Sequence, residues 1–400
     1  MHDRENARQA CQPCPVCGGA GSRVFFDLAQ QPVLIGVLWP SRDEALSSPK
    51  GDLQLVFCPD CGFIYNHRFE PNLLQYSQDY DNSLHFSPVY QEYAEATARN
   101  LVGRYDIRNK TVLEIGCGKG DFLMLLCRLG HNRGIGFDQS YEERTLPPEI
   151  ADQLSFVKDL YGPTYASYQA DLICSRYVLE HIPNPLEFLG MLGQTIADPE
   201  RTLIYCEVPN IDLILNQHSV WDIIYEHYAY FSLGSLVRLF ENAGFQVIQG
   251  RETFSNQFAS LEARLGKGPS RWEFDHTREV AELARAVDSF KDHFQSMVTR
   301  WQTVLQSSAA GKRRVVLWGG GAKGVSFLNM LGVGSEIDYV VDINPGKQGR
   351  YIAGTGQQIT SPQFLKKYVP HTVIVLNPAY RNEIQDMLDN LGLAPEVLCV

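Results

Sequence analysis

The chain has 400 residues, of which 44% are hydrophobic and 20% charged, and its formal net charge is −11. This is the composition of a globular protein, and the length predicts two or three domains. No apolar run approaches the ~20 residues that a bilayer-spanning helix needs. The polar N-terminus has no signal-peptide core, so we expect a cytoplasmic protein. The acidic balance argues against nucleic acid as a partner.

Near the N-terminus, two copies of a Cys-Pro-x-Cys-Gly motif begin at Cys14 and Cys58. Each copy supplies two thiols, and its glycine lets the turn aim backbone N–H groups at sulfur. The thiols of Cys14, Cys17, Cys58 and Cys61 form the ligand set of a closed structural Zn²⁺ site. Buried free cysteines or a redox dithiol would leave the duplication unexplained. Cys11 completes a further C-x-x-C step, but it lacks the glycine and is not counted as a ligand.

A polar, tyrosine-rich segment at residues 76–83 precedes a helix that is expected over residues 89–102. The segment includes Tyr80. A loop of this kind beside a ligand-binding domain can close as a lid. A surface loop with packed tyrosines explains the same residues equally well.

A strand, a glycine turn and a helix are predicted next. The apolar run at residues 112–115 indicates a buried strand, and leucines at helical spacing after Phe122 indicate a helix. Between them, Gly116, Gly118 and Gly120 allow the backbone to approach a ligand closely. This order is the first unit of a nucleotide-binding α/β fold, in which the ligand lies at the carboxyl end of the strand.

Further strands are predicted at residues 134–138, 156–157, 171–175 and 203–209, alternating with helices. That alternation predicts a parallel, doubly wound sheet. The second strand ends in Asp138, whose carboxylate can accept hydrogen bonds from both ribose hydroxyls of a nucleoside. The alternative for Asp138 is a solvated strand end.

The Glu-x-Gly-x-Gly-x-Gly spacing that starts at Glu114 differs from the dinucleotide fingerprint and resembles the S-adenosylmethionine loop of class I methyltransferases. The resemblance implies S-adenosylmethionine as the methyl donor, with Asp138 on the ribose and Asp159 near the adenine. The donor-binding residues implied in this way are Glu114, Gly116, Gly118, Asp138, Gln139, Asp159 and Arg176.

After the fifth strand, Glu226 and His227 lie within an aromatic stretch at residues 221–232. Such surroundings can hold the pKa of an imidazole near neutral pH, and an imidazole of that pKa is suited to proton abstraction. A packed histidine beside a surface glutamate is the more common outcome of this pattern.

From about residue 272 to residue 310, apolar residues recur at alternating three- and four-residue steps. This pattern predicts one long amphipathic helix that links two domains. We expect it to pack on the catalytic core, although a dimer seam would leave the same pattern.

The C-terminal part opens with a strand at residues 314–318, followed by a G-x-G-x-x-G loop from Gly319 to Gly324. Asp342 follows where a ribose-binding acid would lie, so a second site for NAD has to be considered. Alternatively, Gly321, Lys323 and Gly324 could cradle phosphates of a nucleotide-linked substrate.

Taken together, the cysteine motifs, the aromatic Glu-His stretch and the C-terminal domain resemble the zinc-containing sugar C-methyltransferases of deoxysugar biosynthesis. Those enzymes act on a nucleotide-linked 4-keto sugar, and their C-terminal domain has a nucleotide-binding shape without redox chemistry. This chain departs from the family at residues 225–231, which are one residue shorter than the usual motif, and at residues 257–260, where Gln-Phe-Ala-Ser replaces Gly-Gly-Ser. The departures concern the substrate and not the methyl donor.

For methylation of a carbon next to a ketone, we assign an expected role to each candidate catalytic residue. His227 is the base that removes a proton from the accepting carbon, and Glu226 orients or charges its imidazole. Tyr80 and Tyr225 hydrogen-bond the developing enolate oxygen, a role that His181 could also fill. Leu179-Glu180-His181 is, however, frequent in class I methyltransferases of many specificities.

The fold predicted from these observations is α/β, with four parts. They are a zinc-binding module at 1–75, a class I methyltransferase domain at 76–267, a linking helix at 268–310 and a second Rossmann-like domain at 311–400. We expect a monomer or homodimer that methylates a small molecule at a carbon next to a ketone. An O- or N-methyltransferase is the main alternative, while an RNA-modifying enzyme fits the acidic charge poorly and a NAD-dependent oxidoreductase would use the C-terminal loop.

Overall fold

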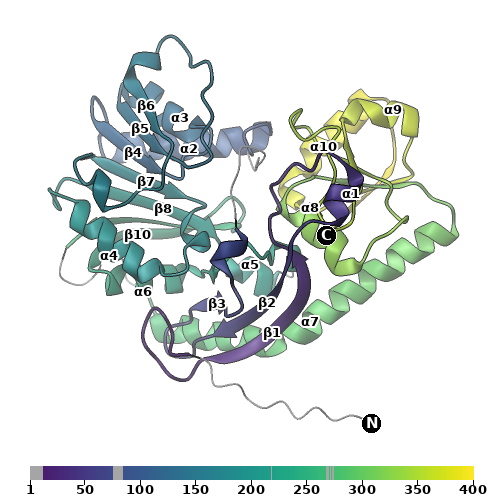
Figure 1. The fold of residues 1–400 in the computed structure, drawn as a ribbon, viewed down its shortest axis with the longest axis horizontal. Coiled ribbons are helices and arrows are strands. Elements are labelled where there is room, and N and C mark those ends of the chain that lie inside the picture. Colours follow the sequence, from purple (N-terminus) through teal and green to yellow (C-terminus); the bar gives the residue numbers. More distant parts are fainter. Residues whose placement is uncertain (1–11, 75–83, 218, 267–269, 271, 273) are drawn as a thin grey trace.

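The structure is a computed structural model that describes residues 12–74, 84–217, 219–266, 270, 272 and 274–400. Its strands form three sheets of four, seven and five strands. The four-stranded sheet lies between the two larger α/β units, and the long helix α7 runs along one side of it (Figure 1). Among the described helices, none is both long and apolar enough to cross a membrane.

The four-stranded sheet contains the N-terminal strands and one strand from much later in the chain. Its order is β1-β2-β3-β9, and all of its pairs are antiparallel. The strands are β1 (Arg23–Pro32), β2 (Lys50–Phe57), β3 (Ile64–Asn66) and β9 (Ala229–Tyr230), with α1 (Arg42–Leu46) and the 3₁₀ turn η1 (Pro71–Leu73) between them. Because β9 pairs with β3, the segment that carries His227 is fixed to the cysteine module.

The seven-stranded sheet confirms the predicted strand–turn–helix order. Its strand order is β10-β11-β8-β7-β4-β5-β6, in which β11 alone runs antiparallel to its neighbours. The strands are β4 (Thr111–Ile115), β5 (Arg133–Phe137), β6 (Leu154–Val157), β7 (Leu172–Arg176), β8 (Leu203–Pro209), β10 (Phe245–Thr253) and β11 (Phe258–Leu265). The helices are α2 (Pro88–Arg104), α3 (Asp121–Gly130), α4 (Pro185–Thr195), α5 (Ile211–Asn216) and α6 (Leu233–Asn242), with 3₁₀ turns η2 (Ala151–Gln153), η3 (Pro163–Tyr165), η4 (Leu179–His181) and η5 (Val220–Asp222).

The predicted linking helix is α7 (His276–Ala310), and its apolar seam packs within the chain. Phe290 and Phe294 contact Phe26 of β1, with ring centroids 5.1 and 4.7 Å apart. The helix also contacts α5 and α8. The expectation that it packs on the catalytic core is therefore only partly correct, because the aromatic face of β1 supplies a large apolar surface for it.

The C-terminal sheet is wholly parallel, in the order β14-β13-β12-β15-β16. Its strands are β12 (Val315–Trp318), β13 (Tyr339–Val341), β14 (Gln358–Thr360), β15 (Thr372–Val375) and β16 (Glu396–Cys399). Around it lie α8 (Ala322–Leu331), α9 (Leu365–Tyr368), α10 (Arg381–Asn390) and the 3₁₀ turns η6 (Pro362–Phe364) and η7 (Pro378–Tyr380). The fold class predicted from the sequence, with a second Rossmann-like domain, is confirmed.

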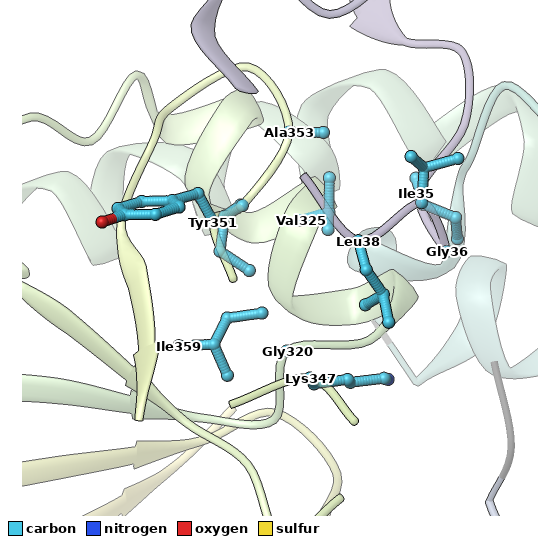
Figure 2. A pocket seen from close by; sticks show the side chains of 11 residues that line it. Ile35, Gly36, Leu38, Gly320, Val325, Lys347, Tyr351, Ala353 and Ile359 are labelled. Atoms are coloured by element: carbon cyan, nitrogen blue, oxygen red, sulfur yellow. The ribbon is translucent and has the colours of Figure 1, made fainter. Parts of the chain in front are cut away.

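One side of the glycine loop of the C-terminal domain lies against the N-terminal module. Ile35, Gly36 and Leu38 approach this loop, and between them and Lys347 lies a cavity of about 10 Å³ (Figure 2). Such a volume is on the order of one water molecule. It does not admit NAD. The expected phosphate-binding lysine, Lys323, forms an ion pair with Asp222 of η5 instead.

Candidate active site and metal centre

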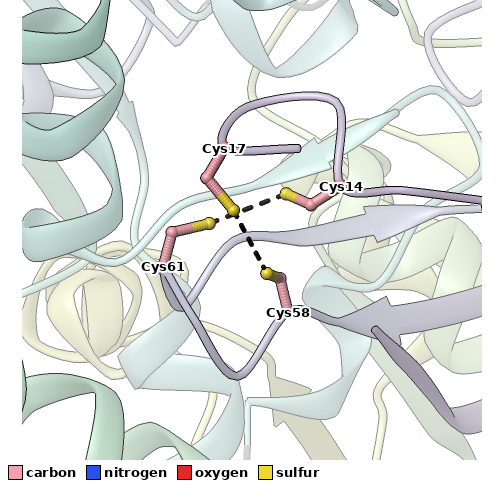
Figure 3. Close-up of side chains that lie close together, drawn as sticks. All are labelled: Cys14, Cys17, Cys58 and Cys61. Carbon is pink, nitrogen blue, oxygen red and sulfur yellow. Dashed lines mark hydrogen bonds between the residues drawn. The ribbon is translucent and has the colours of Figure 1, made fainter. Parts of the chain in front are cut away.

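The four predicted cysteines converge on one point (Figure 3). The Sγ atoms of Cys14 and Cys61 are 3.6 Å apart, as are those of Cys17 and Cys58. All four sulfur atoms lie within 4.8 Å of one another. With Zn–S bonds of about 2.3 Å, a regular tetrahedron places its sulfurs about 3.8 Å apart. The four thiols therefore fit a tetrahedral zinc ion.

The two cysteine motifs fold into matching turns. Gly18 N–H donates to the Cys14 carbonyl at 2.8 Å, and Gly62 N–H donates to the Cys58 carbonyl at 2.9 Å. Both glycines have a left-handed backbone, with φ of 73° and 72°, which explains why glycine follows each second cysteine. Gly19 N–H also points at the Cys17 sulfur at 3.4 Å, as the sequence predicted for this turn.

The close contacts between the thiols shift their pKa values in opposite directions. The contact with Cys14 lowers the pKa of Cys58, whereas the contact with Cys58 raises the pKa of Cys14 to about 12. A bound divalent cation would replace the thiol protons, because thiolates are the form that binds metal.

The glycine loop after β4 is shaped for close approach. Gly116, Gly118 and Gly120 all have positive φ, at 69°, 53° and 78°. A Cβ atom on Gly116 would lie 2.2 Å from Val178 Cγ2, so the loop packs directly on the segment that follows β7. Asp138, at the end of β5, accepts from Gly118 N–H at 2.8 Å and from Ser140 N–H at 2.8 Å. The predicted ribose acid is therefore held against the predicted donor loop.

Glu114 and Arg176 lie beneath this loop and are both buried. Burial raises the pKa of Glu114 to about 8, while Arg176 acts in the opposite direction. The Arg176 guanidinium donates to Glu207 at 2.7 and 3.0 Å, and it lies over the Phe122 ring with its Cζ atom 4.1 Å from the ring centroid. Its direct contact with the methyl donor stays a prediction.

Glu207 is the centre of a network that sequence reasoning missed. Besides Arg176, it accepts from the hydroxyls of Tyr93, Tyr177 and Tyr205. Burial alone would raise the pKa of Glu207, but Arg176 and these hydroxyls lower it overall. In the parallel pairing of β7 with β8, Arg176 is opposite Glu207, so aligning the two predicted strands would have found this pair.

The remaining two predicted donor-binding residues lie near the surface. Gln139 and Asp159 are exposed. Asp159 accepts from the Tyr165 hydroxyl at 2.6 Å and from Leu160 N–H at 2.8 Å. Both residues follow the carboxyl ends of neighbouring strands, β5 and β6, as their predicted roles require. Their contacts with a bound nucleoside stay predictions.

His181 and His227 come together although they are distant in the sequence. Their ring centroids are 5.0 Å apart, with the ring planes at 76°. His181 ends η4, and His227 precedes β9. Burial lowers the pKa of His181 to about 4, and burial together with His181 lowers the pKa of His227 well below its ordinary value. Both imidazoles are therefore neutral at pH 7, and each keeps one nitrogen lone pair.

Glu226 and Tyr225 hold this segment to the N-terminal module. The Glu226 carboxylate accepts from Ile35 N–H at 2.5 Å, and its peptide carbonyl lies 2.9 Å from His181 Nδ1. The Tyr225 hydroxyl accepts from Glu70 N–H at 3.0 Å and donates to the Arg68 carbonyl at 3.4 Å. Those backbone groups border a cleft of about 320 Å³. The predicted catalytic roles of both residues stay predictions, and Tyr80 lies outside the described residues.

Two family models match the chain. Residues 87–250 match a methyltransferase domain, and residues 271–392 match a C-methyltransferase C-terminal domain. C-methyltransferase NovU of Streptomyces niveus is 25% identical over 401 aligned residues, which cover 93% of this chain and 91% of NovU. The mitochondrial ubiquinone biosynthesis O-methyltransferase of Dictyostelium discoideum is 25% identical over 120 residues, covering 26% of this chain and 37% of that enzyme.

Solved methyltransferases also resemble part of the chain. The 1,6-didemethyltoxoflavin-N1-methyltransferase of Burkholderia thailandensis is 16% identical with a TM-score of 0.33, and the match covers 45% of this chain and 82% of that one. Magnesium protoporphyrin IX methyltransferase from Synechocystis is 17% identical with a TM-score of 0.34, covering 44% and 83%.

Proposed function

Since this chain is an S-adenosylmethionine-dependent methyltransferase with a C-methyltransferase C-terminal domain, we propose that it methylates a carbon next to a ketone. The acceptor that we propose is a nucleotide-linked deoxysugar or a similar small polar molecule. Two independent features support this proposal: the neutral histidine pair beside the donor loop, and the similarity to NovU along nearly the whole chain.

The histidine pair lies next to the donor loop. Val178 packs on Gly116 of the donor loop, and η4, which ends in His181, begins at the next residue. The same segment brings His181 to within ring contact of His227. The two imidazoles thus lie just beyond the carboxyl end of β7. Ligands of this type of fold bind at the carboxyl ends of the strands.

Methylation of a carbon next to a ketone requires a base, whereas the methyl donor needs no activation. The donor supplies an electrophilic methyl group, so the protein has to create and aim the nucleophile. A carbon next to a ketone becomes a nucleophile when it loses a proton and the negative charge moves to the oxygen. His227 is buried, and its lowered pKa keeps the ring neutral, so a nitrogen lone pair is present to take that proton. The same lowering of the pKa makes it a weaker base than a solvated imidazole. The neutral His181 ring has its Nδ1 2.9 Å from the Glu226 carbonyl, which can only accept, so its Nε2 lone pair makes it a second candidate base and not a donor to the resulting oxygen.

We also propose that the four cysteines bind one structural Zn²⁺. The ion would tie the turn at Cys14 to the turn at Cys58. Arg238 of α6 donates to the Cys61 carbonyl at 2.6 Å, so the second turn is attached to the methyltransferase sheet. Zinc would therefore stabilise the module that carries β3 and, through it, the position of His227.

The decisive experiment is to incubate the enzyme with donor labelled in its methyl group and a panel of 4-keto nucleotide sugars. We expect the label to appear in a new carbon–carbon bond next to the ketone. In deuterated solvent, wild-type enzyme should also exchange the proton on that carbon. Label found on oxygen or nitrogen would contradict the proposal and support the alternative class, to which the O-methyltransferase of D. discoideum belongs.

A further inference from the structure

A second group of metal-ligating side chains lies at the histidine pair. Ligand atoms of Glu180, His181 and His227 all fall within 4.8 Å of one another. The distance between His181 Nε2 and Glu180 Oε1 is 4.0 Å. These residues come from η4 and from the segment before β9, and none of them belongs to the cysteine cluster.

A hydrogen bond places the proton and the lone pair of the His181 ring. The Glu226 carbonyl can only accept a hydrogen bond, so His181 Nδ1, 2.9 Å away, carries the proton. In the neutral ring this leaves the lone pair on Nε2, which is the atom nearest to Glu180. A backbone carbonyl that holds the second ring nitrogen in this way is the usual support of a metal-ligating histidine.

Glu180 supplies a second, independent observation. Its side chain is 2% exposed, and its Oε2 has no hydrogen-bond partner among the residues that the structure describes. Burying a carboxylate oxygen without a hydrogen-bond partner destabilises the folded protein, and a bound cation would offset this destabilisation. The His181 side chain is 22% exposed, which leaves a path from solvent.

We propose that Glu180, His181 and His227 form a site for a divalent transition-metal ion of the zinc class, and that its occupation inhibits the enzyme. Two imidazoles and one carboxylate suit such ions better than Mg²⁺ or Ca²⁺, which prefer oxygen ligands. The inhibition follows because a lone pair of His227 that binds a metal cannot also accept a proton. This second half rests on the proposed function, whereas the binding site does not.

Binding is tested on the purified protein with its four-cysteine metal retained. Co²⁺ is titrated by calorimetry and visible absorption. We expect one equivalent bound outside the cysteines, with d–d bands and without the thiolate charge-transfer band. Glu180→Gln and His181→Gln should each weaken this binding by more than about tenfold. Methyl-donor affinity, measured in parallel, shows that each variant is folded.

His131→Asn is the matched control, because His131 is exposed at the end of α3 and its left-handed backbone tolerates asparagine. It should bind Co²⁺ as the wild type does. No extra equivalent in the wild type, or equal affinity in the wild type and both ligand variants, would overturn the site.

Inhibition is tested separately with Zn²⁺. We expect loss of turnover that is competitive with the acceptor, not competitive with the donor, and reversed by a chelator. Unchanged or increased turnover while Co²⁺ and Zn²⁺ still bind would overturn the inhibitory half alone. Normal turnover by His227→Gln would instead refute the proposed base, and the Co²⁺ titration would still decide independently whether the metal site exists.

Discussion

The methyltransferase sheet and the C-terminal sheet share one backbone arrangement around their first strands. Gly116 N–H donates to the Phe137 carbonyl at 2.8 Å, and Gly319 N–H donates to the Val341 carbonyl at 2.7 Å. The residue after each of those carbonyls is an aspartate. Asp138 accepts from Gly118 N–H and Asp342 accepts from Gly320 N–H, both at 2.8 Å.

The two loops differ in the side chains around them. Where β4 has the buried Glu114, β12 has Leu317. The Nζ atom of the buried Lys347 lies 3.9 Å from Asp342 Oδ2, and the N-terminal module approaches Gly320 of the loop. The same backbone arrangement therefore has different neighbours in the two domains. The first loop packs on Val178, whereas one side of the second loop lies against the N-terminal module.

Loss of the proposed zinc ion should have the largest effect, because we propose that this ion stabilises the N-terminal module that lies against the second loop. Cys58→Ser removes one zinc ligand, and structural zinc contributes ~10–16 kcal/mol of apparent binding free energy. We expect loss of zinc and a large fall in thermal stability, measured by metal analysis and calorimetry. Cys399→Ser, a cysteine outside the cluster, is the control and should keep its zinc. A zinc-free Cys58→Ser protein of full stability would contradict the prediction.

The next largest effect concerns His227, the proposed base of the methyltransferase domain. His227→Gln should lower turnover by ~10²–10⁴-fold, the usual range for a positioned base. Donor affinity should stay nearly unchanged, because binding the donor needs no base. Proton exchange of the substrate into solvent should disappear as well. If a stable variant keeps near-normal turnover, the base is another residue, and His181 is then the next candidate.

A matched pair of substitutions tests the two aspartates directly. Asp138→Ala should weaken donor binding at least about tenfold, because hydrogen bonds to a charged acceptor contribute roughly 1.5–3 kcal/mol. Asp342→Ala should leave donor affinity as it is. Calorimetric titration with S-adenosylmethionine measures both. Equal losses in the two variants would show that the C-terminal loop also takes part in binding the donor.

Per pH unit, the smallest effect concerns the Glu114 position. Burial raises the pKa of Glu114 from 4.5 to about 8, so the folded donor-free protein binds more protons than the unfolded chain in this range. Stability should therefore fall as pH rises from 4.5 to 8, by up to about 1.4 kcal/mol per pH unit for one group. Glu114→Gln should remove that part of the slope in denaturant unfolding at pH 5, 6.5 and 8. Burial also raises the pKa of Glu180 to about 8, so Glu180 should still contribute to the pH dependence of stability in the Glu114→Gln variant. An unchanged slope would mean that Glu114 is charged in the folded protein.

Local features of the fold could be predicted from the sequence. The Cys-Pro-x-Cys-Gly repeats fold into the same turn twice, and the glycine spacing after β4 needs the left-handed conformations that are found there. These features depend on a few adjacent residues, and glycine is the residue that permits them. The strands of the parallel sheet likewise follow from runs of apolar residues.

The contacts between distant segments could not be predicted in the same way. Glu226 was expected to act on His227, yet its carboxylate accepts from Ile35 N–H in the N-terminal module. Tyr225 likewise binds the backbone of residues 68 and 70. The meeting of His181 with His227 depends on how β9 docks. Periodicity and spacing carry no information on such docking, because it arises from packing between separate elements.

The pairing of β3 with β9 has a consequence for the order of events during synthesis. Ile64 pairs with Tyr230, so the sheet of the first module is incomplete until the ribosome has released most of the methyltransferase domain. Until then the edge of β3 is open, and an open edge invites pairing with other chains. Pairs so distant in sequence also form late, because closing a long loop has an entropic cost. Assembly of the histidine pair should therefore be among the last steps as the nascent chain matures, after the cysteine turns have already closed.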